Sequence, residues 1–303
     1  MATRGKILVI RGGAIGDFIL TFPVLSALRE QFPETHLEVL GYPHIADLAV
    51  AGGLVQRARS IEAQPLAGFF ARSGNLSQEL REYFASFDII ISYLYDPDKI
   101  FQTNVASCSK AQFIAGPHRP DENRKIHAAK VFLQPLERLA IFEAEETPRL
   151  WLQSRATSFN QLAFHPGSGS ERKNWPVKNW AELIETTLAE TDYPILLVGG
   201  EADASRLQFL GGTIPRARLE IAENLKLVDL AARLQNCAGF VGHDSGISHL
   251  AAALGLPGLL LWGDTVEEIW RPPSAKIRII RGSEGLADLS VDRVVTELKQ
   301  LFV

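Results

Sequence analysis

Short apolar runs alternate with amphipathic stretches along most of the chain. The runs are rich in aliphatic residues and are bounded by glycine or polar residues, which is typical of strands buried on both faces of a parallel sheet. Strands of this kind that alternate with helical stretches predict an α/β fold with doubly wound parallel sheets. The expected strands cover 7–10, 37–40, 88–92, 161–164, 194–198, 239–241, 259–262 and 276–280.

Amphipathic helices are expected between these strands. Residues 176–190 carry an apolar stripe at helical spacing and begin with a proline that suits a first helical turn. Residues 291–303 have apolar positions at near-helical spacing, which predicts a helix that packs against its domain. The helix after the first strand should be kinked in its first turn by Pro23. Asp264 or Thr265 is expected to cap a later helix.

The length favours two domains. A chain of 303 residues is long for one domain and suits two of about 150 residues each. Residues 136–158 carry acidic residues and Pro148 before a new strand begins at Gln161, which marks a candidate linker. We therefore expect domains over 1–155 and 156–303, each with the plan of strand, glycine turn and helix.

Composition excludes several classes of protein. The chain has 31 Lys and Arg against 35 Asp and Glu, and its net charge of -4 creates no field that would attract nucleic acid. Cys108 and Cys237 have neither metal-ligand spacing nor a disulfide pattern, so no metal site is expected and the cytoplasm, a reducing compartment, is favoured. No apolar run approaches the roughly 20 residues that span a bilayer. Any contact with a membrane is therefore expected to be peripheral.

A glycine turn follows the first expected strand. Gly12, Gly13 and Gly16 lie after 7–10, at the carboxyl edge where open α/β sheets bind ligands. Their spacing is neither G-x-G-x-x-G nor a P-loop, so the turn does not indicate a dinucleotide site. Asp17 admits two interpretations: a helix N-cap, which aspartate favours, or a general base that takes a proton from a substrate hydroxyl.

Two further strands lead into loops with candidate ligand-binding residues. Small residues in 165–176 give an anion access to backbone amides, and Lys173 adds a point charge, so Ser168 and Lys173 are expected to bind a phosphate group. A solvated turn is the alternative. Glu201 follows the strand at 194–198, where a carboxylate can accept hydrogen bonds from the two hydroxyls of a ribose. An exposed loop glutamate is the alternative there.

A second glycine turn follows the strand at 239–241. Asp244, Ser245 and Gly246 precede an apolar helical stripe, and His249 shares a helix face with Ser245. One interpretation is a diphosphate at the helix N-terminus with His249 hydrogen-bonding nearby, and the other is a structural cap with a satisfied histidine. A hydrolase is not indicated, because these residues lack the geometry of a catalytic triad and the G-x-S-x-G elbow is missing.

Taken together, these motifs resemble glycosyltransferase family 9, the bacterial heptosyltransferases that build the lipopolysaccharide inner core. The resemblance implies the GT-B fold, in which two Rossmann-like domains face a central cleft, with the acceptor mainly on 1–155 and the nucleotide sugar mainly on 156–303. It also implies inverting chemistry with no required metal or cofactor. It rests on Ile7 to Arg11 with Gly16, Asp17 and 23–28, on His165 to Gly169 with Lys173, Trp175 and Pro176, and on Asp244 to Gly246 with 249–255.

The family's functional residues carry over motif by motif. Asp17 resembles the catalytic base, and Ser168 and Lys173 resemble the contacts to the donor diphosphate. Glu201 resembles the ribose-binding acid. Four residues of the second glycine turn and its helix resemble the family's contacts to the sugar and diphosphate: Asp244, Ser245, Gly246 and His249.

The resemblance implies transfer of a heptose from ADP-heptose to a glycolipid or oligosaccharide acceptor. Whether the protein is located at the inner face of the inner membrane stays open. The stretch 118–130 has four Lys and Arg against two acids and could meet an anionic glycolipid, although a solvated loop is the alternative. Two other functions stay open. The chain could be a non-catalytic nucleotide-sugar binding or scaffold protein, or a nucleotide-sugar epimerase of the same architecture.

Overall fold

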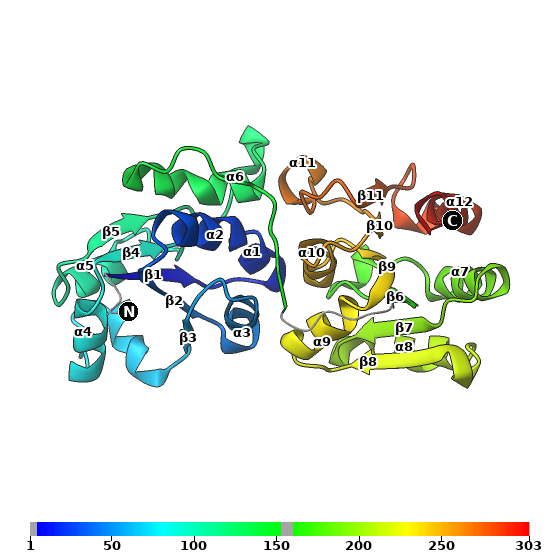
Figure 1. The fold of residues 1–303 in the computed structure, drawn as a ribbon, viewed down its shortest axis with the longest axis horizontal. Helices are drawn as coiled ribbons and strands as arrows, with labels where there is room; N and C mark the ends of the chain where they lie inside the picture. The colour runs from blue at the N-terminus through cyan, green and yellow to red at the C-terminus, as the bar shows by residue number, and fades with distance from the viewer. Residues whose placement is uncertain (1–4, 153–159, 303) are drawn as a thin grey trace. The chain divides into compact units, whose positions relative to one another are not determined.

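The computed structural model describes residues 5–152 and 160–302, which form two compact units (Figure 1). The units divide between Glu146 and Thr147. The boundary expected at residues 155 and 156 lies outside the described residues. Each unit is built on one parallel sheet, as the strand pattern predicts.

The first unit contains a five-stranded parallel sheet in the order β3-β2-β1-β4-β5. β1 is the central strand, and its Ile7 pairs with Leu37 on one side and Ile89 on the other. Because β1 is covered on both faces, its sequence is a continuous apolar run. The strands are β1 (Lys6–Arg11), β2 (His36–Gly41), β3 (Arg57–Ser60), β4 (Ile89–Ser92) and β5 (Gln112–Ala115).

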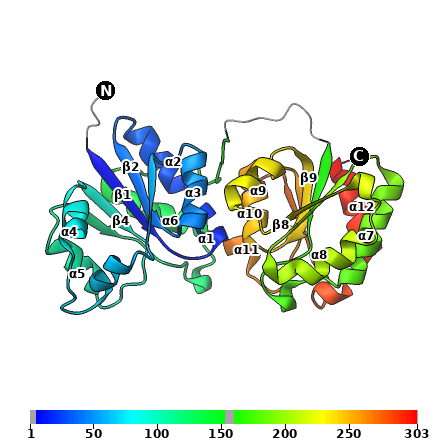
Figure 2. The ribbon, with the colours of Figure 1, turned by 90° about the horizontal axis from the view of Figure 1, so that it is seen from below.

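Helices cover both faces of this sheet (Figure 2). On one face, apolar side chains of α4, α5 and η1 form a core with alternate residues of β1 and β4. On the other face, α2 contacts α6. The helices are α1 (Ile15–Ile19), α2 (Phe22–Gln31), α3 (Pro43–Ala51), α4 (Gln78–Ala85), α5 (Ile100–Ala106) and α6 (Ala128–Leu133), with 3₁₀ turns η1 (Gln64–Phe70), η2 (Glu122–Arg124) and η3 (Gln134–Leu139).

The prediction of a single kinked helix after the first glycine turn is wrong, because the structure has two helices there. α1 ends at Ile19, and α2 begins at Phe22 with Pro23 as its second residue. Proline is well tolerated in the first turn of a helix, where its missing N–H would have no intrahelical partner. Pro23 therefore starts a new helix and leaves α1 as a separate short segment that carries Asp17.

The second unit contains a six-stranded parallel sheet in the order β11-β10-β9-β6-β7-β8. β6 is the first of these strands in the chain and lies inside the sheet, where its Ala163 pairs with Leu196 and Phe240. The strands are β6 (Gln161–His165), β7 (Ile195–Gly199), β8 (Leu219–Glu223), β9 (Cys237–His243), β10 (Gly258–Leu261) and β11 (Ile277–Ile280).

The helices of the second unit also form two layers (Figure 2). α7, α8 and α12 share one apolar core with the sheet, while α9 and α10 lie together on the other face. The amphipathic helices expected at 176–190 and 291–303 are confirmed as α7 and α12. The helices are α7 (Val177–Glu190), α8 (Ala204–Gly211), α9 (Leu227–Leu234), α10 (Gly246–Ala253), α11 (Glu267–Trp270) and α12 (Val291–Phe302), with 3₁₀ turns η4 (Glu171–Lys173), η5 (Glu201–Asp203), η6 (Arg216–Arg218) and η7 (Leu286–Asp288).

The apolar pattern fails to predict three strands, β3, β5 and β8. All three lie at the edge of a sheet. An edge strand is paired on one side, so solvent reaches it and polar residues are tolerated. β3, for example, has the sequence Arg-Ala-Arg-Ser and is only partly buried. Such a strand gives no continuous apolar run for a sequence pattern to detect.

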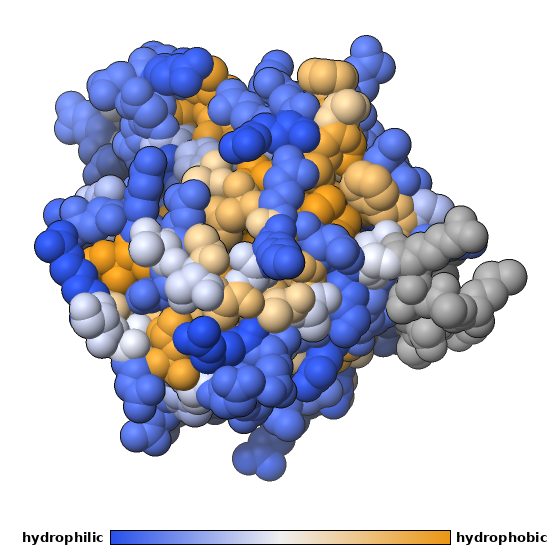
Figure 3. Space-filling view, turned by 90° about the vertical axis from the view of Figure 1, so that its left-hand side faces the viewer, coloured by the Kyte–Doolittle hydropathy of each residue, from blue (hydrophilic) through white to orange (hydrophobic). Residues whose placement is uncertain are grey.

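Several large apolar side chains are exposed at the surface. On the face of the first unit drawn in Figure 3, apolar side chains form separate patches between hydrophilic ones. The exposed large apolar residues of this unit include Val50, Phe70, Tyr95 and Phe142. Exposed apolar side chains are common on proteins, so such a residue indicates a function only where it lies beside a site. Within 5–152 and 160–302, no helix is both long and apolar enough to cross a membrane.

Candidate functional site

In each sheet there is a switch point, a pair of neighbouring strands from which the chain continues toward opposite edges of the sheet. In the first sheet this point lies between β1 and β4, and in the second it lies between β6 and β9. Open α/β sheets bind ligands outside the carboxyl ends of the strands at such a switch point. The strands that border the two points are followed by most of the expected site residues: Asp17 follows β1, Ser168 and Lys173 follow β6, and Asp244 to His249 follow β9.

Asp17 is the third residue of α1 and not its N-cap. Its Oδ2 accepts a hydrogen bond from the backbone N–H of Ala14 at 3.2 Å, and its side chain stays 30% exposed. Gly13 has a φ of 103°, and a Cβ there would lie 3.1 Å from Asp17 Oδ2, so glycine is needed for both conformation and space. Gly12 precedes this residue, and Gly16 is the second residue of α1. The turn thus orients the carboxylate and leaves part of it accessible.

Arg11, at the end of β1, is a buried cation to which the sequence alone assigns no role. Its side chain is 2% exposed. Nη1 donates to the backbone carbonyl of His118 at 2.8 Å, and Nη2 lies 3.9 Å from Asp17 Oδ1. The guanidinium also lies over the ring of Phe132, 4.3 Å from its centroid. Burial lowers the pKa of Arg11, and the negative charge of Asp17 opposes that change.

Lys173 forms an ion pair with Asp244. Lys173 Nζ lies 2.7 Å from Asp244 Oδ2, which joins the loop after β6 to the residue after β9. The same oxygen accepts a hydrogen bond from Thr265 Oγ1. The expectation that Asp264 or Thr265 caps a helix is wrong, because α11 begins at Glu267 and Val266 precedes it. Thr265 instead helps to hold Asp244, whose side chain is 11% exposed.

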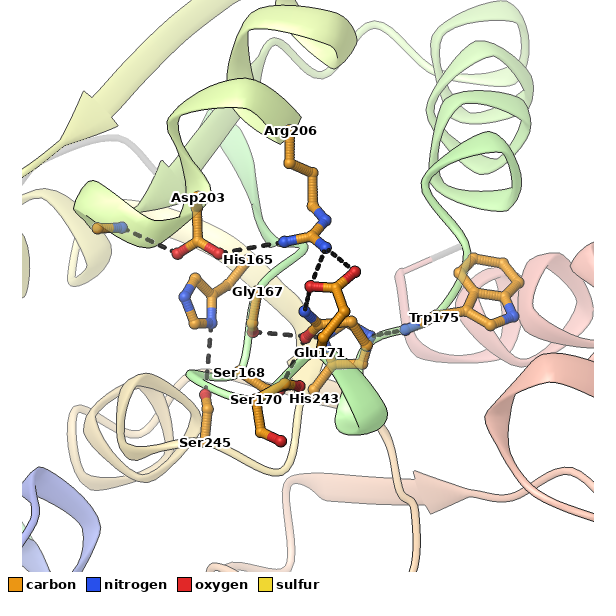
Figure 4. Close-up of polar contacts among 12 residues, drawn as sticks. His165, Gly167, Ser168, Ser170, Glu171, Trp175, Asp203, Arg206, His243 and Ser245 are labelled. Carbon is orange, nitrogen blue, oxygen red and sulfur yellow. Dashed lines mark hydrogen bonds and ion pairs between the residues drawn. The ribbon is translucent and has the colours of Figure 1, made fainter.

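Side-chain hydrogen bonds fix the conformation of the loop that carries Ser168 (Figure 4). Ser168 Oγ lies 2.7 Å from Asn174 Oδ1. Asn174 Nδ2 donates to Glu171, and Arg206 on α8 donates to both carboxylate oxygens of Glu171 at 2.9 and 3.0 Å. These hydrogen bonds from Arg206 lower the pKa of Glu171. The conformation of the loop is therefore fixed by hydrogen bonds within it and by Arg206 of α8.

His243, the last residue of β9, joins the two ends of this loop. Its ring is fully buried. Nε2 accepts a hydrogen bond from the backbone N–H of Trp175 at 2.8 Å, and Nδ1 lies 3.3 Å from the carbonyl oxygen of Gly167. A neutral imidazole with its proton on Nδ1 satisfies both contacts. His243 therefore ties the loop after β6 to the strand that leads into Asp244.

The start of α10 has the structural cap that one interpretation of the second glycine turn expects. Ser245 is the N-cap residue, and its Oγ accepts from the backbone N–H of Ser248. Ser245 Oγ also lies 3.3 Å from His165 Nδ1, at the end of β6. Gly246 opens the helix, and His249 is buried within it. The capping interaction does not block the positive end of the helix, because the first-turn amides still point out of the N-terminus.

Glu201 is exposed after β7, in η5. Its neighbour Asp203 is buried and accepts a hydrogen bond from the backbone N–H of Gly200 at 3.0 Å. A Cβ on Gly167 would lie 2.0 Å from Asp203 Oδ1. Asp203 thus supports the loop after β6, and it needs glycine at position 167 to do so. The side chain of Glu201, in contrast, is exposed to solvent.

Burial sets the protonation of the two histidines at this edge. It lowers the pKa of His165 to about 4, although the charge of Asp203 opposes the change. It lowers the pKa of His243 to about 3. Both rings are therefore neutral near pH 7. Neutrality is needed at His243, because a protonated ring could not accept the hydrogen bond from Trp175.

We expect the free energy of unfolding of the second unit to fall as the pH drops from 7 toward 4. A histidine whose pKa is lowered in the folded state binds its proton in the unfolded chain first, so stability is present above about pH 6.5 and is lost below it. The slope of this loss is set by the number of protons that the unfolded chain binds and the folded chain does not. Urea unfolding followed by tryptophan fluorescence measures the effect, since all five Trp residues lie after position 146.

The variant His243→Gln tests the assignment, because its amide can both donate and accept. We expect it to lose less stability between pH 7 and pH 5 than the unsubstituted protein. His44→Gln, which changes an exposed histidine of the first unit, is the matched control and should keep the original dependence. An unchanged pH dependence in His243→Gln would contradict the prediction.

The fold is that of known sugar-transferring enzymes. A structure of E. coli ADP-heptose lps heptosyltransferase II superimposes with a TM-score of 0.79 at 20% identity and covers 98% of each chain. E. coli heptosyltransferase WaaC with ADP superimposes with a TM-score of 0.78 at 18% identity over 98% of this chain and 99% of that one. The two parallel-sheet α/β units thus form the GT-B fold of glycosyltransferases, as predicted.

Sequence comparison identifies the family. Residues 136–297 match Glycosyltransferase family 9 (heptosyltransferase). Lipooligosaccharide heptosyltransferase 2 from Haemophilus ducreyi is 25% identical over 98% of this chain and 99% of its own length. The chain belongs to glycosyltransferase family 9, and the predicted resemblance to this family is confirmed.

Proposed function

We propose that this glycosyltransferase moves a heptose from ADP-heptose to a hydroxyl of a lipopolysaccharide-core-like acceptor, with inversion at the anomeric carbon. Two relatives support these substrates. The structure of WaaC was solved with ADP, and the Haemophilus ducreyi protein is a lipooligosaccharide heptosyltransferase. The residues of the two switch points support the proposal independently.

The observation that carries the proposal is the position of Lys173 beside the start of α10. Lys173 is held at 2.7 Å by Asp244, two residues before the helix begins at Gly246. A cation and a helix N-terminus at the switch point of a sheet form an anion site. A donor diphosphate would take over Lys173 and accept hydrogen bonds from the first-turn amides of α10. Asp244 would then be free to accept hydrogen bonds from sugar hydroxyls.

Other residues of the second unit complete the donor site in this proposal. Ser168 lies in the loop shaped by Asn174 and can turn its hydroxyl toward a phosphate oxygen. Glu201 is exposed at the carboxyl end of β7, where its carboxylate can accept both ribose hydroxyls. Ser245 and Gly246 approach the diphosphate through the helix start, and His249 supports that helix from its buried position.

The chemical step assigned to the first unit is proton removal. Asp17 would accept the proton of an acceptor hydroxyl as its oxygen attacks the anomeric carbon of the heptose. The bond between that carbon and the diphosphate oxygen breaks at the same time, and the nucleoside diphosphate carries away the electron pair. Lys173 and the N-terminus of α10 would stabilise the charge that develops on the leaving group. A single displacement of this kind inverts the anomeric centre.

A glycolipid acceptor would bring the enzyme to a membrane surface. Peripheral contact at the inner face of the inner membrane is therefore part of the proposal, with the lipid portion of the acceptor remaining in the bilayer.

We expect ADP to raise the unfolding temperature of the protein more than UDP or GDP does. A ligand that binds the folded state alone stabilises it by about 2.7 kcal/mol when its concentration is about 100 times its Kd. Thermal unfolding with each diphosphate at equal concentration measures the preference. Equal stabilisation by the three diphosphates would contradict the choice of an adenine nucleotide.

The transfer itself is tested with ADP-heptose and heptose-deficient lipopolysaccharide. We expect a heptosylated acceptor and one ADP for each transfer. Tight donor binding without transfer to any acceptor in a broad panel would favour a non-catalytic binding protein. Release of free sugar or an epimerised donor in the absence of acceptor would favour an epimerase.

A further inference from the structure

Two exposed aromatic rings lie beyond the carboxyl ends of β4 and β5, next to the switch point of the first sheet. Tyr95 follows β4 and His118 follows β5, which are neighbouring strands of that sheet. Their ring centroids are 4.6 Å apart with an interplanar angle of 57°. Tyr95 is 72% exposed. β4 also borders β1, the strand that leads to Asp17, so the carboxyl ends of these strands bring the ring pair and the carboxylate to one edge.

The exposure of Tyr95 contrasts with that of a tyrosine two residues earlier. Tyr93 is buried, and its hydroxyl donates to the carbonyl of Phe132 at 2.6 Å. Tyr93 thus has a clear packing role at the end of β4. Tyr95 contributes little to the core and presents a large rigid ring to solvent. An exposed aromatic ring gains significance when it lies beside a site, and this one lies at the edge where α/β sheets bind ligands.

Arg11 connects this ring pair to Asp17. Its guanidinium donates to the carbonyl oxygen of His118 at 2.8 Å and lies 3.9 Å from the carboxylate of Asp17. Arg11 is itself held in place by burial and by the ring of Phe132. The backbone that carries His118 and the carboxylate of Asp17 are therefore positioned by one buried side chain.

We propose that Tyr95 and His118 form the acceptor subsite, in which a sugar ring of the acceptor stacks on the face of Tyr95. This inference rests on the proposed function and adds the residues that recognise the acceptor. A sugar ring has a face of C–H groups with partial positive charge, and the face of an aromatic ring is negative. Tyrosine loses little conformational entropy on binding because it has two χ angles. His118 supports the ring of Tyr95 and can donate or accept a hydrogen bond at the sugar's edge.

The subsite explains how a hydroxyl could be presented to Asp17. Stacking fixes the plane of the sugar ring but leaves its hydroxyls at the periphery. A hydroxyl at that periphery can then approach the carboxylate, which the Gly13 turn keeps 30% exposed. Positioning of this kind accelerates a reaction because the reacting groups no longer have to find each other.

The test uses the full chain, ADP-heptose and a deacylated, heptose-deficient core oligosaccharide. The variants are Tyr95→Ala, Tyr95→Phe and, as a matched control, Phe142→Ala, which removes another exposed ring of the first unit. Transfer kinetics give the KM of each substrate, and calorimetry gives the Kd of the oligosaccharide whether or not transfer occurs. Deacylation removes contributions from a lipid surface.

We expect Tyr95→Ala to raise the KM and the Kd of the oligosaccharide about tenfold, the value of one stacking contact. Tyr95→Phe should stay within about twofold of the unsubstituted protein, since it keeps the ring. The KM of ADP-heptose should not change in either variant, and Phe142→Ala should behave like the unsubstituted protein. Unfolding temperatures should agree within error, because Tyr95 is exposed.

Two results would overturn the subsite. One is an oligosaccharide Kd that Tyr95→Ala leaves unchanged, and the other is a change in the KM or Kd of the donor, which would place Tyr95 at the nucleotide. Oligosaccharide binding that depends on Tyr95 without any transfer would retain the subsite and refute the proposed transferase reaction. Absence of both oligosaccharide binding and transfer would refute both.

Discussion

Asp17→Asn is expected to reduce kcat by about 100- to 10,000-fold, the range that general base catalysis contributes. The amide is almost isosteric with the carboxylate but cannot accept a proton from the attacking hydroxyl. Its oxygen can still accept the hydrogen bond from Ala14, which Asp17 accepts at 3.2 Å. The turn at Gly13 should therefore be preserved, and the loss should appear in kcat rather than in the KM of the donor.

Steady-state transfer kinetics and thermal unfolding measure this prediction together. Asp88→Asn is the matched control, because Asp88 also accepts a backbone hydrogen bond, from Lys6 at 2.7 Å, but precedes β4 at the opposite edge of the sheet. We expect the control to retain its kcat. Full transfer activity in Asp17→Asn would show that another group removes the proton and would leave Asp17 as a structural residue of α1.

Lys173→Met is expected to reduce kcat/KM for the donor by about 100- to 1,000-fold, as removal of one transition-state charge contact does. Methionine keeps most of the apolar length of lysine and removes its charge. The leaving diphosphate would lose its cation while the N-terminus of α10 remained. The substitution also leaves Asp244, which is 11% exposed, without its ion-pair partner. An unpaired carboxylate so close to the expected diphosphate would repel it.

A double-mutant cycle with Asp244→Asn separates these two effects. If the loss arises mainly from the unpaired carboxylate, Asp244→Asn should restore part of the donor affinity of Lys173→Met. If it arises from the lost cation, the double variant should remain as slow as Lys173→Met. Lys299→Met, which breaks an exposed ion pair with Glu190, is the matched control and should change little. Normal donor kinetics in Lys173→Met would contradict the proposed diphosphate site.

The fold could be predicted from the sequence wherever a strand is covered on both faces. β1, β6 and β9 are interior strands, and their apolar runs are visible without a structure. Three of the four edge strands, β3, β5 and β8, carry too few consecutive apolar residues to be predicted, since solvent reaches an edge strand and polar residues are tolerated there. The fourth, β11, is rich in isoleucine and is predicted from the sequence. The break between α1 and α2 does not follow from the sequence, because Pro23 permits either a kink or a new helix start.

The candidate site shows the same division. The sequence placed Asp17 and Lys173 after strands, and the switch-point rule then located them at sheet edges. It did not indicate that Lys173 pairs with Asp244, because the two residues are 71 positions apart. Arg11 and His243 carried a weak signal, in that each ends a strand. Their roles depend on His118, Gly167 and Trp175, which chain topology brings to them.

The sequence by itself determined the parallel α/β fold and the family motifs. Buried strands and glycine turns are encoded in runs of consecutive residues, which can be recognised without a structure. The tertiary structure alone decided which polar groups meet. It placed a buried arginine between Asp17 and the Tyr95–His118 pair, and it joined the two loops of the second unit through one neutral imidazole. Such contacts depend on the order of strands in each sheet, since neighbouring carboxyl ends converge whatever their separation along the chain.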